Sequence, residues 1–319
     1  MTASERASGR ADASVRSPDP AGRAAPGRTA SSMRALRQRP TRGGTLWNFV
    51  RRRPIGGVSL VVLAVALVVA AIGPFLGTGD PTATRPTAVF ASPSGEVPMG
   101  GDYLGRSVLA RLVVGLRVSL ALASVAALAA AALGTLLGLI AGYAGGAADE
   151  AIGRLTDVLF AFPTLLLALL VAMVLGPGIP AMLITIVVAT IPVFARVARG
   201  PTLAVRATEY AVAALVGGAT PARVLFRHVL PNISTPLLVQ LAFTLSGALI
   251  AESGLSFLGL GVQPPMPSLG SLLRDGRTYM ELAPWTMLFP GVTLAAAILA
   301  INLLGDELQA FTDPRLRRR

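Results

Sequence analysis

Long stretches without a charged residue constrain the fold of this chain more than any other feature. They lie at residues 54–79, 118–148, 158–195, 229–251 and 282–305. A helix crosses the bilayer with about 20 apolar residues, so the stretch at 158–195 is long enough for two crossings, and glycines and prolines at 176–180 divide it. These stretches predict an all-α polytopic membrane protein with six transmembrane helices. Pro192 leaves the boundaries of the third and fourth helices undefined.

Composition supports a membrane protein and excludes several kinds of site. Hydrophobic residues make up 53% of the chain and charged residues 14%, which is typical of membrane proteins. The absence of cysteine excludes disulfides, thiolate metal sites and cysteine nucleophiles, and a single histidine, His228, excludes a histidine cluster. Lysine is also absent, so the chain has no P-loop for ATP hydrolysis. We therefore assign no catalytic residue, metal site or cofactor to this chain.

The two ends of the chain differ in composition from the part between them. Residues 1–45 are rich in Ala, Arg, Ser, Pro and Gly, which predicts a disordered tail, with an organellar transit peptide as the alternative. The apolar stretch that follows is either a signal peptide or an uncleaved anchor, and its length favours the anchor. The predicted organisation is a tail at 1–45, a first transmembrane helix and outer loop at 46–108, a five-helix core at 109–308 with a polar loop at 196–232, and a basic tail at 309–319.

Arginine placement predicts the orientation of the chain. Basic segments stay on the cytoplasmic side, which places 1–53, 149–157, 196–228 and 306–319 inside and 80–117 and 252–281 outside. The segment 196–228 holds five arginines against Glu209 alone, and each would cost about 2.5–3.5 kcal/mol at the bilayer centre. Both termini are therefore expected in the cytoplasm. A basic tail next to a membrane span indicates orientation rather than nucleic-acid binding.

Small residues recur every fourth position along the predicted second span. The glycines of this series are Gly134, Gly138, Gly142 and Gly146, and they continue from Ala126 and Ala130. Small residues at this spacing let two helices approach closely in a membrane. The series predicts a tight helix–helix face, although the general abundance of alanine is an alternative explanation.

The segment 209–232, here called the elbow, is polar and basic and lies between two long apolar stretches. Its sequence, EYAVAALVGGATPARVLFRHVLPN, predicts two short helices joined by a glycine turn. Gly217 and Gly218 can adopt the left-handed conformation that ends the first helix. Thr220 can cap the second helix, and Pro221 suits its first turn. Such an elbow outside the lipid indicates a docking site, and an ordinary cytoplasmic loop is the alternative.

The elbow resembles the EAA loop of ATP-binding-cassette (ABC) importer permeases. The consensus is EAA, three residues, Gly, nine residues and I-x-L-P. The matching positions are Ala213, Ala214, Gly218, Leu230 and Pro231. Val212 replaces the glutamate, with Glu209 one turn earlier, and His228 replaces the isoleucine. Both departures are usual in the peptide-importer branch of the family.

The resemblance extends over residues 47–316. Residues 99–106 are similar to LGTDxLGRD, with Gly101 in place of threonine and Ser107 in place of the last aspartate. Five further segments resemble AGYxGGxxD, LSFLGLG, APW…FPG, NLLGD and DPR, at 141–149, 255–261, 283–291, 302–306 and 313–315. The combination is typical of the second permease subunit of dipeptide, oligopeptide and nickel importers.

The resemblance implies an ABC type I importer permease-like bundle in a bacterial cell membrane. Its expected partners are a second homologous permease, two ATPase subunits that bind ATP and Mg²⁺, an extracytoplasmic solute-binding protein and membrane lipid, without nucleic acid. Peptides are the expected solute, and nickel or another small solute is the alternative. The residues expected to couple the pathway to an ATPase are Glu209, Tyr210, Ala213, Ala214, Gly218, Thr220, Pro221, Arg223, Arg227, His228, Leu230 and Pro231.

Two other classes of protein remain as alternatives. A secondary carrier would work without an ATPase and would need buried ionisable groups, which the spans do not reveal. A membrane anchor for a signalling ATPase would need no solute pathway.

Several polar positions also have two interpretations. Arg223, Arg227 and His228 contact either lipid headgroups or the ATPase. Asp102 and Arg106 are expected to orient the second span rather than to face solute. Glu252 either contacts the binding protein or is solvated at the interface, and 255–261 either lies in the interface or re-enters as a gate element.

Overall fold

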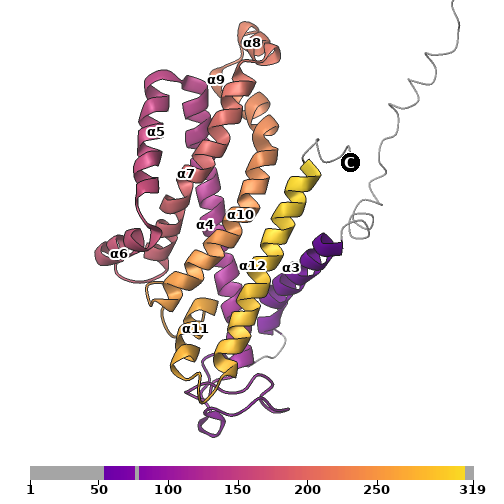
Figure 1. Cartoon of the computed structure of the whole chain (residues 1–319), viewed down its shortest axis with the longest axis vertical. Coiled ribbons are helices and arrows are strands. Elements are labelled where there is room, and N and C mark those ends of the chain that lie inside the picture. Colours follow the sequence, from indigo (N-terminus) through magenta and orange to yellow (C-terminus); the bar gives the residue numbers. More distant parts are fainter. Residues whose placement is uncertain (1–53, 76–78, 313–319) are drawn as a thin grey trace, which may run out of the picture. The chain divides into compact units, whose positions relative to one another are not determined.

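The computed structural model describes residues 54–75 and 79–312, which belong to one compact unit, Trp47–Arg319. The tail predicted at 1–45 lies outside the described residues, as do residues 313–319 of the predicted C-terminal tail. The described part of the chain is helical, without a named strand. Its main helices are α3 (Pro54–Ile72), α4 (Val108–Ala144), α5 (Gly146–Ala161), α6 (Thr164–Leu175), α7 (Ile179–Arg206), α8 (Glu209–Val216), α9 (Pro221–Val224), α10 (Leu230–Phe257), α11 (Leu269–Thr278) and α12 (Trp285–Thr312), with a π-helical turn, η4 (Leu225–Val229), between α9 and α10 (Figure 1).

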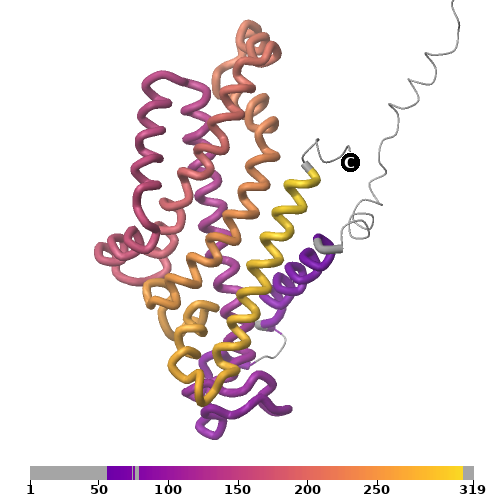
Figure 2. The backbone as a smooth tube through the Cα atoms, in the orientation of Figure 1, coloured from indigo at the N-terminus to yellow at the C-terminus, as the bar shows by residue number. Residues whose placement is uncertain are grey.

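The long helices run alternately between two ends of the bundle. The short helices α8 and α9 lie at one end, called here the elbow end, whereas α11 and the loop before α4 lie at the other, called the loop end (Figure 2). This loop, residues 79–107, contains a 3₁₀ turn at Pro86–Ala88. The fold therefore places the elbow and the longest connecting loop at opposite ends.

The number of membrane crossings is close to the sequence prediction. Four helices of the described residues are long and apolar enough to span a membrane, and a fifth span is counted when α5 and α6 are taken as one bent pair. The shorter apolar helix Gly56–Ile72 corresponds to the predicted first span. An all-helical membrane bundle is confirmed, and the count of six is approximate.

The predicted third span is wrong in its boundaries and its shape. The segment 149–157, expected as an inner loop, is part of α5, and α5 and α6 meet at an angle of 92°. Pro163 explains the break, because proline lacks a backbone N–H and disfavours helix in the residue before it.

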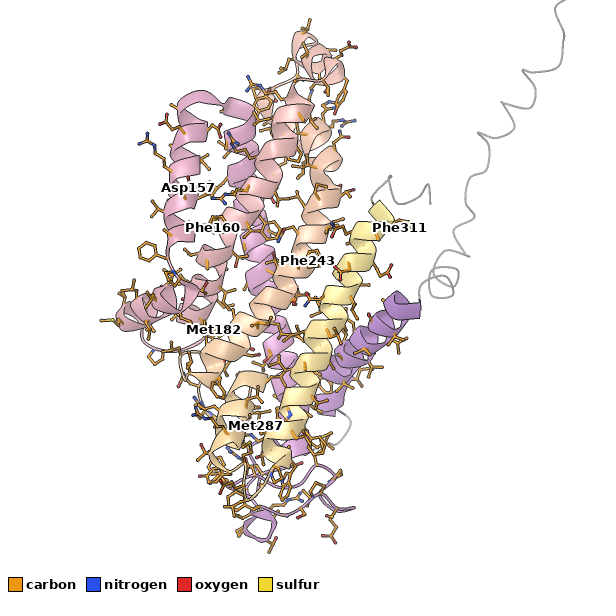
Figure 3. All side chains as sticks on the ribbon, in the orientation of Figure 1. Asp157, Phe160, Met182, Phe243, Met287 and Phe311 are labelled. Atoms are coloured by element: carbon orange, nitrogen blue, oxygen red, sulfur yellow. The ribbon has the colours of Figure 1, made fainter. Side chains whose placement is uncertain are left out.

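Both aspartates of α5 pair with arginines of α7, whereas Glu150 and Arg154 pair with each other within α5. Asp157 accepts a hydrogen bond from Arg196 Nη2 at 2.7 Å, and the Arg196 guanidinium lies 4.2 Å from the Phe160 ring centroid. Figure 3 labels Asp157 and Phe160 on α5. Asp149 pairs in the same way with Arg199. Arginines assigned to a loop in the sequence therefore belong to the last turns of α7, which continues to Arg206.

Helix α4 packs on α7 through three of the glycines singled out above. A Cβ atom added to any of them would approach a backbone carbonyl oxygen of α7 more closely than real contacts allow. The pairs are Gly134 with Ile191, Gly138 with Ala195 and Gly142 with Arg199, at 2.4, 2.4 and 2.8 Å. The two helices are in backbone contact along this face, as in other small-residue membrane interfaces.

Gly146, expected as the fourth position of this face, does not belong to it. Helix α4 ends at Ala144, and Gly146 begins α5 with a φ of +53° and no atom within 4 Å of an added Cβ. The four-residue spacing is meaningful only while the helix continues. Gly146 serves the turn between α4 and α5 instead.

Replacing Gly138 by alanine is expected to lower the free energy of unfolding by about 1–3 kcal/mol, the range typical of overpacking. The new methyl group would lie 2.4 Å from the Ala195 oxygen and 2.7 Å from the Ala198 Cβ, so α4 and α7 must separate. Unfolding in mild detergent measures the change. Gly200→Ala in α7 is the control, because no atom lies within 4 Å of its added Cβ. Equal stability of the two variants would contradict this account.

Candidate functional site

The elbow contains the two helices and the glycine turn that the sequence predicts. Helix α8 is followed by Gly218 with a φ of +84°, and Thr220 Oγ1 accepts a hydrogen bond from the backbone N–H of Arg223 at 3.3 Å. Pro221 occupies the first turn of α9. Gly217 has a φ of −74°, so only Gly218 uses the left-handed conformation. The direction of the elbow therefore depends on a single backbone position.

A small hydrophobic cluster, separate from the main core, holds the elbow on the bundle. Ala211 of α8, Val224 of α9, Val229 of η4 and Ile233 of α10 are at most 1% exposed. They pack with two residues at the same end of α4 and α7, namely Leu139 and Ala198. The base of the elbow is thus buried against the two helices that share the glycine face.

A polar contact also joins α8 to the start of α10. Asn232 Nδ2 lies 3.1 Å from Tyr210 Oη and donates to the His228 carbonyl oxygen at 2.6 Å. The rings of Tyr210 and His228 lie 6.3 Å apart between centroids. Asn232 therefore links Tyr210 of α8 to the backbone of His228, a role that the sequence analysis did not assign to this last residue of the elbow.

Helix α8 carries an apolar patch on the outer surface of the elbow, and the described part of the chain leaves this patch exposed. Val216 is 85% exposed, Val212 48% and Leu215 40%, and all three belong to α8. Most of the other residues expected to couple to an ATPase are exposed as well; they are Glu209, Tyr210, Ala213, Gly218, Thr220, Pro221, Arg223, Arg227 and Pro231, while Ala214, His228 and Leu230 are half-buried. An exposed apolar patch is typical of a protein-binding site.

The π-helical turn η4 connects the elbow to the long helix α10. It spans Leu225–Val229 and was not anticipated from sequence, because its residues are ordinary helix formers. Single π turns within helices are frequent at functional sites. Here the turn lies where a displacement of α9 would pass into α10.

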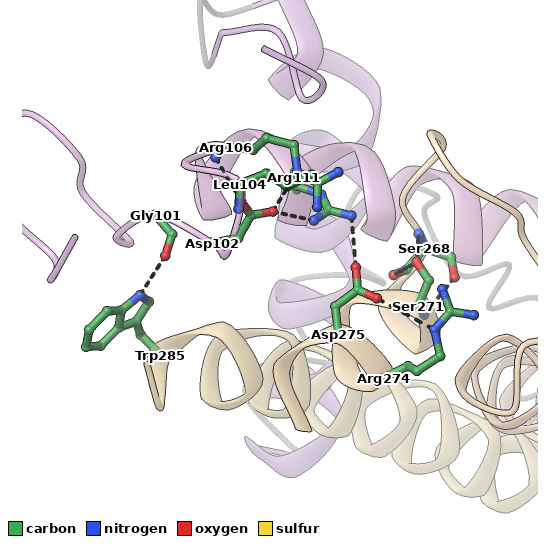
Figure 4. Close-up of polar contacts among 10 residues, drawn as sticks. All are labelled: Gly101, Asp102, Leu104, Arg106, Arg111, Ser268, Ser271, Arg274, Asp275 and Trp285. Atoms are coloured by element: carbon green, nitrogen blue, oxygen red, sulfur yellow. Dashed lines mark hydrogen bonds and ion pairs between the residues drawn. The ribbon is translucent and has the colours of Figure 1, made fainter. Parts of the chain in front are cut away.

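A buried ionic network holds the loop end together. Asp102 lies 2.7 Å from Arg106 Nε and 2.6 Å from Arg111 Nη1, and Arg111 Nη2 lies 3.3 Å from Asp275 of α11 (Figure 4). Nearby, Trp285 Nε1 donates to the Gly101 carbonyl oxygen at 3.2 Å. The structural interpretation of Asp102 and Arg106 agrees with this geometry.

Helix α4 begins ten residues before the predicted start at residue 118, which brings Arg111 into the network.

Glu252 is buried, so neither sequence interpretation of this residue holds. It is 0% exposed and accepts hydrogen bonds from Ser256 Oγ at 2.9 Å and Ser253 Oγ at 3.2 Å. Helix α10 continues to Phe257, six residues beyond the predicted end of the span, so Glu252 and both serines belong to the same helix. Glu252 is also a buried ionisable group, which the sequence analysis did not find in the spans.

The LSFLGLG segment is partly the last turn of α10 and partly the turn that follows. Leu255 and Ser256 are buried, and Ser256 Oγ accepts from the backbone N–H of Val262 at 3.2 Å. Gly259 has a φ of +85°. The segment is therefore fixed on the protein through Leu255 and Ser256.

Comparison with known proteins gives a family. The model of the binding-protein-dependent transport system inner membrane component family matches residues 134–318. The chain belongs to this family. A dipeptide transport system permease protein of Alkalihalophilus pseudofirmus is 36% identical over 84% of this chain and 88% of that protein. A putative peptide transport system permease protein of Brucella suis is 39% identical over 86% of this chain and 92% of that protein. A glutathione transport system permease protein of Pectobacterium atrosepticum is 41% identical over 70% of this chain and 75% of that protein.

A solved structure supports the fold of this inner membrane component. A chain of the inward-facing MetNI methionine ABC transporter superposes with a TM-score of 0.51 at 20% identity, covering 63% of this chain and 96% of that one. The family model and the relatives named above confirm the resemblance to ABC importer permeases, and the structural similarity supports the fold. The elbow lies within the residues matched by the family model, whereas Asp102 and Arg111 lie before them.

Proposed function

We propose that this permease is half of the membrane pathway of an ATP-driven peptide importer, and that its elbow is the docking site of an ATPase subunit. The observation that carries the proposal is the exposed apolar face of α8 on a base buried against α4 and α7. The names of the relatives from three bacteria, which refer to dipeptides, peptides and glutathione, support a peptide solute.

The proposed assembly supplies what this chain lacks. A second homologous permease completes the pathway, two ATPase subunits bind ATP and Mg²⁺, and a solute-binding protein docks at the loop end. No lysine is present for a P-loop, which supports hydrolysis in separate subunits. The arginine distribution supports a cytoplasmic elbow and cytoplasmic termini in a bacterial cell membrane.

The elbow would transmit ATPase movement to two sets of helices. A displacement of α8 reaches α4 and α7 through the small cluster around Ala211, and it reaches α10 through α9 and η4. Packed helices that move as rigid bodies are the usual means of alternating access. Arg223 and Arg227 are exposed at the same end, where they can pair with acidic ATPase side chains or anionic lipid headgroups.

Thiol labelling in intact bacteria tests the orientation, because the chain has no cysteine of its own. A membrane-impermeant maleimide is expected to label Thr84→Cys in the outer loop and to label Ala222→Cys in the elbow only after permeabilisation. Both positions are exposed, so accessibility differs only by side. Labelling of Ala222→Cys from outside would rule out a cytoplasmic ATPase at the elbow.

Purification and reconstitution test the assembly and the solute. The chain isolated in mild detergent is expected to bring down a second permease and ATPases, and the reconstituted complex is expected to take up a tripeptide only with ATP. ATP-independent uptake by this chain alone would instead establish a secondary carrier. Uptake of nickel without peptide uptake would establish the alternative solute.

A further inference from the structure

A hollow of about 300 Å³ lies between the start of α6 and the facing sides of α7 and α10. Its polar lining consists of Thr164, Thr190, Gln240 and Thr244, and Phe243 and Ile186 contribute to its apolar walls. Phe243 lies about midway along α10 (Figure 3). The volume is at the lower end of those of ligand sites, which hold about 300–1,000 Å³. It has room for part of a peptide.

Two of the four polar side chains of the hollow, those of Gln240 and Thr244, lie on one face of α10. Gln240, Thr244, Gly247 and Ala251 recur at helical spacing, and no atom lies within 4 Å of a Cβ added to Gly247. Another face of the same helix lines a second hollow against α4 whose walls are mostly leucine and alanine. The contrast distinguishes a polar side of α10 from an aliphatic side. Polar side chains within membrane helices face a bundle interior or water rather than lipid.

The amide of Gln240 has unused hydrogen-bonding groups. Its Nε2 donates to Thr244 Oγ1 at 3.2 Å, and the Thr190 hydroxyl is already bonded to the Ile186 carbonyl oxygen at 2.5 Å. Among the described residues, no hydrogen bond is found for Gln240 Oε1 or for the second N–H of the amide. One acceptor and one donor therefore remain, which is the complement of a peptide bond.

The lining also indicates what the hollow does not select. None of the described lining residues is charged, and none is His, Cys or Met, so the set lacks the ligands that soft and borderline metal ions prefer. Neutral amide and hydroxyl groups also do not discriminate among charged side chains of a solute. The hollow therefore fits a main-chain amide better than a metal ion or a particular side chain.

We propose that this hollow is a subsite of the solute pathway, in which Gln240 hydrogen-bonds the main-chain amide of a passing peptide. The inference rests on the proposed function and names one residue within the membrane that contacts the transported peptide. Thr244 orients the Gln240 amide through the 3.2 Å contact. Recognition of the main chain alone would let peptides of different sequence pass.

A single-cysteine experiment tests the subsite without depending on transport. In the assembled complex, Gln240→Cys is expected to react with a water-soluble maleimide, and a saturating tripeptide is expected to slow the reaction by about tenfold. Leu238→Cys is the matched control. Leu238 belongs to the same helix and is 55% exposed, but it lines the aliphatic hollow instead of the polar one. It is expected to react slowly, with or without peptide. Absence of labelling at Gln240→Cys, or labelling that the tripeptide does not slow, would overturn the subsite.

Kinetics of the reconstituted complex separate this inference from the proposed function. Gln240→Leu is expected to raise the KM for peptide uptake about tenfold, as for one lost hydrogen bond, with little change in kcat. Thr135→Val, in the aliphatic hollow, leaves KM unchanged. If the wild-type complex imports peptides but Gln240→Leu has the wild-type KM, the subsite is wrong and the importer stands. If the wild-type complex imports nickel and not peptide, and Gln240→Leu raises the KM for nickel uptake, both the subsite chemistry and the peptide solute are wrong.

Discussion

ATP-driven uptake is expected to fall about tenfold or more when Gly218 is replaced by valine, while membrane insertion and assembly remain normal. Gly218 has a φ of +84°, a conformation that costs a residue with a side chain about 1–2 kcal/mol and a β-branched residue more. No atom lies within 4 Å of the added Cβ, so the strain is in the backbone rather than in packing. The turn between α8 and α9 would change its backbone conformation, and α8 would point away from the ATPase subunit that we propose docks on it.

Two further variants make the Gly218 prediction specific. Gly218→Asn is expected to retain much of the uptake, because asparagine tolerates the left-handed conformation better than other residues. Gly153→Val introduces the same side chain in α5, where φ is not positive and the space around the Cβ is open. Uptake and ATPase activity are measured together in reconstituted complexes. Wild-type uptake by Gly218→Val would show that the turn does not transmit force.

Replacing Asp102 by alanine is expected to lower the free energy of unfolding by about 3–5 kcal/mol, the cost typical of removing one partner from a buried ion pair. Asp102 is 5% exposed, and its carboxylate contacts both Arg106 and Arg111. Without it, two buried guanidinium groups lose their shared counter-ion, and the backbone N–H groups of Leu104 and Arg106 lose an acceptor. Unfolding in detergent measures the loss.

A second ion pair in the same chain is the control for Asp102. Asp157 and Arg196 lie 2.7 Å apart, but their side chains are 69% and 57% exposed. Exposed pairs contribute about 0–1 kcal/mol, so Asp157→Ala is expected to have a small effect. If Asp102→Ala is no less stable than Asp157→Ala, the network at the loop end does not hold the start of α4.

The elbow is the part of the site that sequence reasoning predicted best, because its signals are local. A glycine with positive φ, a threonine cap and a proline in the first turn each act within a few residues. Thr220 and Pro221 accordingly occupy the predicted places. The same local logic could not reveal the base of the elbow, since Leu139 and Ala198 reach it from distant helices.

Buried polar residues were the main failure of the sequence prediction. Arg111 and Asp275 are 164 positions apart, and Glu252 looked like an interfacial charge. In a sequence, a charged residue near the end of an apolar stretch is taken as the end of a transmembrane span, whether its side chain faces water or a buried partner. Only the approach of other helices shows which environment it occupies.

Amino-acid order alone determined that this chain is a helical membrane protein with an elbow, because apolar length and turn chemistry depend on residues close in sequence. Tertiary structure decided which three glycines bring α4 against α7, and that Asp102 and Glu252 are buried. These features depend on contacts between helices far apart in the chain, and hydropathy has no information about such contacts. The polar face of α10 belongs to the second group, since Gln240 and Thr190 line one hollow only after α7 and α10 have packed.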